Sequence, residues 1–180
     1  MGVPDLATHY AIGLLLVSRI ERSWVRVVLL ALAALAPDVD ALFGVHRWFT
    51  HSLVVAAPAF SLVALAAIYS RRSLLRYVAV VALLYTLHIA LDLFTAPTPV
   101  LWPLVNQSLQ IQLAVTGVIS SNEVTVEHTV NVIGEPVNFN TREAVEGPIL
   151  TVESIPIPAA TIIVLLLENT GKHRGRQCGA

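Results

Sequence analysis

The sequence predicts an all-α polytopic membrane protein, a helical bundle of about five helices with a small antiparallel β insert on the outer face. Three observations support this prediction. The 180 residues are 56% hydrophobic and 13% charged, whereas soluble domains average about 45–50% apolar and about 25% charged residues. Apolar segments recur along the chain, and basic residues gather in alternate connections between them. The alternative is a compact soluble core in which the same segments are buried.

Five apolar segments define the predicted helices and divide the chain into regions. We expect a membrane bundle over residues 1–96, a β-rich insert over 97–154, a last helix over 155–168 and a disordered basic tail over 169–180. The third and fourth segments have about the 20 residues that cross a bilayer, and the others are shorter. The first has no basic stretch before it, so we expect a retained helix. The segments are 6–20, 24–37, 48–69, 74–94 and 155–167.

Basic residues predict the orientation of the bundle. Alternating the five segments across a bilayer places nine of the 11 Lys and Arg residues on one side. An excess of Lys and Arg in short loops marks the cytoplasmic side, so we expect the N-terminus outside and the C-terminus in the cytoplasm. These nine residues are Arg19, Arg22, Arg26, Arg71, Arg72, Arg76, Lys172, Arg174 and Arg176.

The insert between the fourth and fifth segments has a different pattern of residues. Apolar and polar residues alternate over 108–118, 123–133 and 149–153, with many valines and threonines. Residues 120–122 and 134–136 are typical of turns. We therefore expect a small antiparallel sheet that caps the outer ends of the helices.

Two pairs of ionisable residues interrupt apolar sequence, and the predicted topology places both pairs at the outer face. His88 and Asp92 are four residues apart, so on a helix they share one face and can bind one ion. A helix-stabilising pair is the alternative. Asp38 and Asp40 follow Pro37, where turn chemistry is common. A carboxylate at a helix C-terminus is opposed by the helix dipole, which favours a nearby cation.

Three further histidines lie at the same predicted face. We assign His51, with Thr50 as the expected N-cap of the third segment, and His9, at the start of the first segment, as metal ligands. His46 is a ligand, a proton shuttle or an orienting group. Ionisable groups in membrane segments are costly and usually mark function.

The next residue, Arg47, has two open interpretations. Its guanidinium fork suits phosphate or carboxylate, so it can hold an anionic substrate. Alternatively, it is a counter-ion for Asp38 or Asp40.

The predicted ligands supply nitrogen and oxygen but no sulfur, because the single cysteine, Cys178, lies in the polar tail. Such ligands suit Zn²⁺ foremost, with Mn²⁺ or Fe²⁺ as alternatives. Three histidines and three aspartates exceed the need of one tetrahedral zinc and suit a two-metal site, so we expect one or two ions. The six predicted metal ligands are His9, Asp38, Asp40, His51, His88 and Asp92.

The order of these motifs resembles the YdjM-like family of LexA-regulated, membrane-bound metal-dependent hydrolases over roughly residues 1–104. The resemblance implies a multi-pass protein whose histidines and aspartates bind metal and hydrolyse a substrate. Trp48 and residues 104–107 depart from the family pattern, which bears on substrate identity. The matching motifs are Thr8-His9-x-x-x-Gly13, Pro37-Asp38-x-Asp40, His46-Arg47-x-x-Thr50-His51-Ser52-Leu53, His88-x-x-x-Asp92-x-x-Thr95 and Leu101-Trp102-Pro103.

The predicted function is hydrolysis of a phosphoester or another lipid-derived ester at the outer membrane interface, with Asp38, His46 and Arg47 as catalytic residues. Membrane lipid is the expected partner, and the oligomeric state is left open. A net charge of −1 gives no basic face for nucleic acid, and no Gly-x-Ser-x-Gly element supports a serine hydrolase.

Two other functions are considered. The first is a metal-binding membrane protein without catalysis, such as a transporter or sensor, although a transporter places ionisable groups nearer the midplane. The second is a structural protein in which His–Asp pairs hold helix ends.

Overall fold

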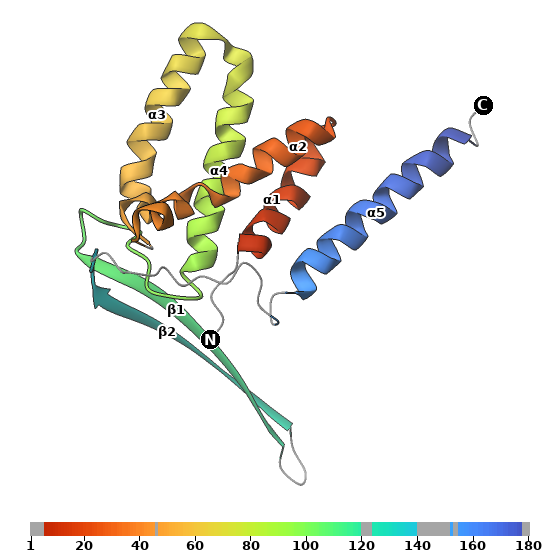
Figure 1. Ribbon diagram of the computed structural model, residues 1–180. Helices are drawn as coiled ribbons and strands as arrows, with labels where there is room; N and C mark the ends of the chain where they lie inside the picture. The colour runs from red at the N-terminus through yellow and green to blue at the C-terminus, as the bar shows by residue number, and fades with distance from the viewer. Residues whose placement is uncertain (1–5, 46, 120–123, 140–151, 153–154, 178–180) are drawn as a thin grey trace.

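The computed structural model describes residues 6–45, 47–119, 124–139, 152 and 155–177. It contains a helical bundle and one two-stranded antiparallel sheet (Figure 1), as the sequence predicts. The α-helices are α1 (Leu6–Ile20), α2 (Trp24–Ala31), α3 (Leu53–Ser70), α4 (Leu75–Asp92) and α5 (Pro156–Gln177), and the strands are β1 (Gln107–Ile119) and β2 (Val124–Pro136). Short 3-10 helices are η1 (Leu32–Leu35), η2 (Pro37–Phe43), η3 (Phe49–His51) and η4 (Arg72–Leu74).

Helices α3 and α4 form the long apolar hairpin of the bundle (Figure 1). Within the described residues, two stretches are long and apolar enough to cross a membrane, Leu53–Ser70 and Arg72–Asp92. Only 11% and 17% of these stretches are buried inside the protein. A core helix of a soluble protein would be mostly buried, so this exposure favours a lipid environment. The remaining apolar helices are shorter, so the structure supports two full spans rather than the five predicted.

Helix α2 ends earlier than the sequence predicts, and this early end positions the acidic motif. The α-helix stops at Ala31 and the chain continues in two 3-10 helices, η1 and η2. Pro37 lacks the backbone N–H that would continue an α-helix by donating to the carbonyl of Ala33. Gly44 then ends η2 with a left-handed φ of 71°. These tight turns bring η2 against α4.

Gly13 allows α1 to cross closely over the end of α2. A Cβ at this position would lie 3.1 Å from both the carbonyl oxygen of Ala31 and the Cβ of Ala34. Ala34 also belongs to the buried apolar cluster, together with Val17, Val27 and Leu84. The crossing therefore fixes α1 and η1 against α4.

Strands β1 and β2 pair over their full length, from Gln107 opposite Pro136 to Ile119 opposite Val124. Residues 134–136 thus belong to a strand, and the prediction of a turn there was wrong, because their backbone pairs with Gln107–Leu109. The predicted turn at 120–122 lies outside the described residues, as does nearly all of the predicted strand at 149–153.

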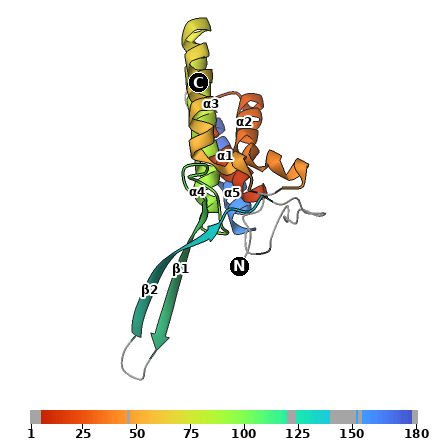
Figure 2. The same cartoon turned by 90° about the vertical axis from the view of Figure 1, so that its left-hand side faces the viewer.

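The β hairpin is attached at its base and extends away from the helices (Figures 1 and 2). Thr98 pairs with Leu109, and the backbone N–H of Ile111 donates to the carbonyl of Leu93 at 2.7 Å. The remainder projects past the bundle, so it does not cap the helices as expected. Since opposite residues of an antiparallel pair share a face, Leu113 and Val130 lie together on one apolar face, and both are exposed.

The connections rich in basic residues lie together at the end of the bundle opposite the hairpin (Figure 1). Arg26 of α2 donates to the hydroxyl of Tyr77 in α4, and Arg19 of α1 forms an ion pair with Glu168 of α5. Helix α5 continues to Gln177, so residues 169–177 of the predicted disordered tail are helical. Four residues of this stretch are good helix formers: Lys172, Arg174, Arg176 and Gln177.

Candidate metal centre

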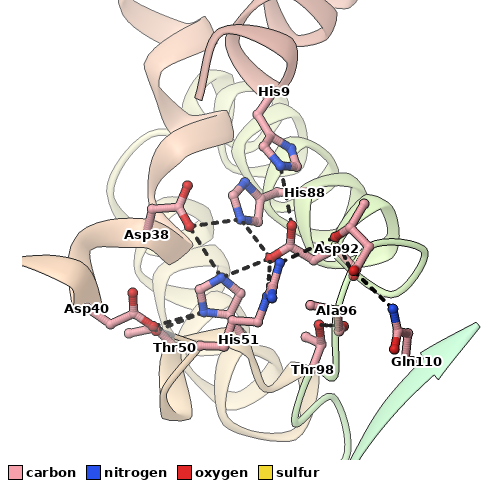
Figure 3. Close-up of polar contacts among 12 residues, drawn as sticks. His9, Asp38, Asp40, Thr50, His51, His88, Asp92, Ala96, Thr98 and Gln110 are labelled. Carbon is pink, nitrogen blue, oxygen red and sulfur yellow. Dashed lines mark hydrogen bonds and ion pairs between the residues drawn. The ribbon is translucent and has the colours of Figure 1, made fainter. Parts of the chain in front are cut away.

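Side chains from three separate segments meet at the hairpin end of α4 (Figure 3). Asp38 comes from η2, His51 from η3, and His88 and Asp92 from neighbouring turns of α4. One nitrogen or oxygen atom from each of the four lies within 4.8 Å of the others, so the group can hold a metal ion. Three members are buried, and Asp38 is partly exposed.

The spacing of the four atoms matches the ligand shell of one ion. Asp38 Oδ1 lies 3.5 Å from His51 Nε2 and 3.4 Å from His88 Nε2. Asp92 Oδ2 lies 3.3 Å from His51 Nε2 and 3.5 Å from His88 Nε2. Tetrahedral bonds of about 2.0–2.2 Å would separate neighbouring ligand atoms by about 3.3–3.6 Å. These four separations fall within this range, and all four ligand atoms lie within 4.8 Å of one another, so the donor set can hold one divalent ion.

The two histidines are held with Nε2 towards the group. His88 Nδ1 lies 2.7 Å from the carbonyl oxygen of Ala34. Because a carbonyl only accepts, Nδ1 carries a proton, and Nε2 is the nitrogen that can bind a metal ion. His88 Nε2 is buried and has no hydrogen-bond partner in the part of the chain that the structure describes. The two carboxylates that face these imidazoles require positive charge between them, which a metal ion can provide.

Asp40, predicted as a metal ligand, instead lies behind His51. Its Oδ2 atom is 3.0 Å from His51 Nδ1 and accepts hydrogen bonds from Trp48 N at 2.7 Å and Thr50 Oγ1 at 2.9 Å. It is not part of the four-residue group. A carboxylate on the far nitrogen of a metal-binding histidine fixes its tautomer and raises its basicity. The structure thus brings Asp40 to the site in a supporting position.

The N-cap of α3 also differs from the prediction. Thr50 bonds to Asp40, and Ser52 caps the helix by accepting from Val55 N at 3.3 Å. The same Ser52 hydroxyl donates to the carbonyls of Val100 and Trp102. Ser52 therefore joins α3 to the segment after α4, a role that its own motif does not reveal.

Asp92 is contacted from two further sides, by His9 and Arg47. His9 Nε2 lies 3.3 Å from Asp92 Oδ1, and its ring stacks on His88 with centroids 3.9 Å apart. Arg47 Nε donates to Asp92 Oδ2 at 3.2 Å, and its Nη2 donates to Thr95 Oγ1 at 3.3 Å. Arg47 is thus a counter-ion of Asp92, not of Asp38 or Asp40 as considered from the sequence.

The backbone at Arg47 has an uncommon conformation where the side chain contacts Asp92. Arg47 has a left-handed φ of 59°, which is uncommon for a residue other than glycine and often occurs at functional sites. The hairpin is tied to the same point, because Gln110 Nε2 donates to the carbonyl of Thr95 at 2.9 Å. His46, predicted as catalytic, lies outside the described residues.

Charge balance at the site depends on the histidines. Burial favours the neutral imidazole of His51, but hydrogen bonds to Asp38, Asp40 and Asp92 outweigh it and raise the pKa of His51 to about 10. Burial likewise opposes ionisation of Asp38, while hydrogen bonds from His51 and His88 hold its pKa below the usual value. Without a metal ion, His51 therefore carries the balancing positive charge.

Comparison with known proteins supports the identity that the motifs suggest. The chain matches no curated protein and no solved structure. The model of one family, described as the YdjM inner membrane protein, matches residues 5–167. This match includes the two candidate membrane spans, the four candidate metal ligands and the β hairpin. The chain therefore belongs to the YdjM inner membrane protein family.

Proposed function

We propose that the protein is a membrane-bound metal-dependent hydrolase with one divalent ion held by Asp38, His51, His88 and Asp92. The observation that carries the proposal is the spacing of the four ligand atoms, which matches one ion shell. A bound divalent ion supplies Lewis acidity and brings the pKa of a bound water close to neutral. The basic residues at the opposite end support an outer location of the site, with the N-terminus outside and the C-terminus in the cytoplasm.

Exposure indicates the side from which substrate approaches. The side chains of Asp38 and Arg47 are 14% and 11% exposed, whereas those of His51 and His88 are fully buried. Asp38 therefore lies where water and substrate enter. Asp38 has a second carboxylate oxygen, so we assign it to accept a proton from the attacking water.

Arg47 supports an anionic substrate. A guanidinium carries five N–H donors, and the contacts of Arg47 with Asp92 and Thr95 use two of its nitrogens. Donors remain for a phosphate or carboxylate at the mouth of the site, which favours a phosphoester or another anionic lipid-derived ester. Since His46 directly precedes Arg47, we retain it as the proposed proton shuttle.

The geometry favours one ion over two. Asp92 presents Oδ1 away from the four-atom group, and among the described residues only His9 pairs with that oxygen. Two protein ligands are too few for a second dedicated metal. We therefore assign His9 to orient Asp92 rather than to bind an ion itself.

A non-catalytic metal-binding protein is the second candidate, and a specific observation favours it. Four protein ligands would leave no open position on a tetrahedral zinc, as in structural zinc sites. A six-coordinate Mn²⁺ or Fe²⁺ held by the same residues would keep about two positions for water and substrate. The metal that the protein retains therefore separates the two functions.

The test combines metal analysis with an activity screen. Detergent-purified protein, His88→Ala and Asp92→Ala are measured for bound metal, with His128→Ala on the exposed β hairpin as the matched control. We expect about one divalent ion per chain in the wild type and the control, and little in the other two variants. Unchanged metal content in both variants would show that these residues do not bind the metal.

The same samples are screened against phosphomonoesters, phosphodiesters and phospholipids with Zn²⁺, Mn²⁺ or Fe²⁺ restored. Hydrolysis that disappears in Asp38→Asn with metal still bound supports the enzyme. Retained metal with no hydrolysis under any condition supports the non-catalytic protein.

A further inference from the structure

A second cluster of charged residues lies at the opposite end of α4. Arg76 Nη2 donates to the hydroxyl of Tyr77 at 2.5 Å, and Arg26 Nη1 of α2 donates to the same oxygen at 3.1 Å. Two guanidinium groups therefore converge on one neutral oxygen. Like charges repel, so this arrangement favours an anion nearby.

Glu21 neutralises only part of this charge. Its Oε2 atom is 3.2 Å from Arg26 Nη1, while its Oε1 atom accepts from the backbone N–H groups of Arg22 and Ser23. Arg76 has no carboxylate partner among the described residues. Further positive charge lies close by in the sequence, at Arg22, Arg71 and Arg72.

A small pocket adjoins the converging guanidinium groups, and its lining is amphiphilic. Glu21, Arg76 and Tyr77 form its polar part. The rest of the wall is apolar, formed by Ile20, Leu30 and Val80. A free phosphate ion would leave the apolar part in contact with water, whereas a lipid fills both parts.

The surroundings match a membrane–water interface. Trp24 begins α2 and Tyr69 lies one residue before the end of α3, so both adjoin the basic connections, and their side chains are exposed. Exposed Trp and Tyr rings gather at the level of the lipid headgroups, and basic pockets between membrane helices bind acidic headgroups. The pocket therefore lies at the depth where a phospholipid phosphate is found.

We propose that this pocket binds one acidic phospholipid, with its phosphate between Arg26 and Arg76 and an acyl chain along Ile20, Leu30 and Val80. Guanidinium groups recognise phosphate with paired N–H donors. The site is independent of the proposed metal centre, because Arg76 and Asp92 are 16 residues apart on α4, or about 24 Å at 1.5 Å per residue. It holds a lipid in place and does not hydrolyse it.

The test measures binding of phosphatidylglycerol to the detergent-purified full chain by native mass spectrometry, with phosphatidylcholine as the neutral reference. An arginine near the membrane surface contributes about 1 kcal/mol to binding of acidic lipid, which is roughly a fivefold change. We expect Arg26→Gln and Arg76→Gln to lose about this factor each, and Arg76→Lys to lose less. Arg72→Gln is the matched control, because it removes the same charge from the same connection, but Arg72 neither lines the pocket nor donates to the Tyr77 hydroxyl as Arg26 and Arg76 do.

Three results would overturn the proposal. The first is an equal loss in Arg72→Gln and Arg76→Gln, which would show general attraction to a basic surface. The second is displacement of the lipid by inorganic phosphate at comparable concentration, which would make the site a soluble-anion site. The third is equal affinity for phosphatidylcholine. Folding of each variant is checked by its thermal midpoint in phosphatidylcholine. If Arg26→Gln does not fold, the binding measured for Arg76→Gln tests the proposal.

Discussion

Replacement of Asp40 tests whether this carboxylate supports a ligand or is one. Asp40 is 1% exposed, and its Oδ2 atom bonds to His51 Nδ1, Trp48 N and Thr50 Oγ1. Asp40→Asn keeps an acceptor in this position but removes the negative charge. Asp40→Ala removes the acceptor as well, so the Trp48 N–H loses its hydrogen bond to this carboxylate.

The expected magnitude follows from this arrangement. Loss of a hydrogen-bonding partner behind a metal-binding histidine lowers metal affinity about 10–100-fold, which corresponds to about 1.4–2.7 kcal/mol. We expect Asp40→Asn at the lower end, since the imidazole stays oriented and loses only basicity. We expect Asp40→Ala at the upper end, because His51 can then rotate. Asp92→Asn, which changes a ligand, should lose more than either.

The assay is a competition titration of the purified protein against a chelator of known affinity, with Glu135→Gln on the exposed hairpin as the charge-matched control. Wild-type affinity in Asp40→Ala would refute the supporting role. A loss in Asp40→Asn as large as that in Asp92→Asn would also refute it, and would restore Asp40 as a ligand, as first predicted.

Three further predictions concern protonation, helix packing and capping. Because the pKa of His51 is raised to about 10 without metal, a metal ion must displace the proton of His51 at any pH below that value. The apparent metal affinity should therefore rise by up to about tenfold per pH unit, with about one proton released on binding. Calorimetry in buffers of different ionisation enthalpy measures the number of protons released. Gly13→Val should destabilise the bundle by about 1–3 kcal/mol, because the added side chain would press on Ala31 and Ala34. Gly117→Val is the control and should be nearly neutral, since no atom lies within 4 Å of the added Cβ. Equal thermal midpoints of the two variants would contradict this prediction. Ser52→Ala should cost about 1 kcal/mol through loss of the α3 cap, and an unchanged midpoint would show that its hydrogen bonds do not stabilise the fold.

Much of the architecture follows from patterns within single segments. The apolar lengths of 48–69 and 74–94 predict the α3–α4 hairpin, and the arginine positions predict that the His and Asp residues gather at the other end. Alternation of apolar and polar residues predicts the paired strands. The extension of the hairpin away from the bundle was not predictable in this way, since it depends on contacts of Leu93 and Thr98 with the strand base.

The supporting contacts of the metal centre had no signal in the sequence. Ala34 holds His88 through a backbone carbonyl, and any residue type supplies that group. Ser52 and Thr50 are both ordinary capping residues, so their separate roles depend on where the chain turns. His9 and Arg47 have the right chemistry for several roles, and only their distances to Asp92 distinguish them.

The sequence by itself determined the membrane class, the residue types of the site and the end of the bundle at which they meet, because hydropathy, charge and spacing are local properties. Only the tertiary structure decided which aspartate faces the histidine Nε2 atoms. A 3-10 helix has about three residues per turn, so Asp38 and Asp40, two residues apart in η2, point in different directions. The path of η2 against α4 and η3 then directs Asp38 into the group and Asp40 to the back of His51, and that path is set by packing between segments distant in the chain.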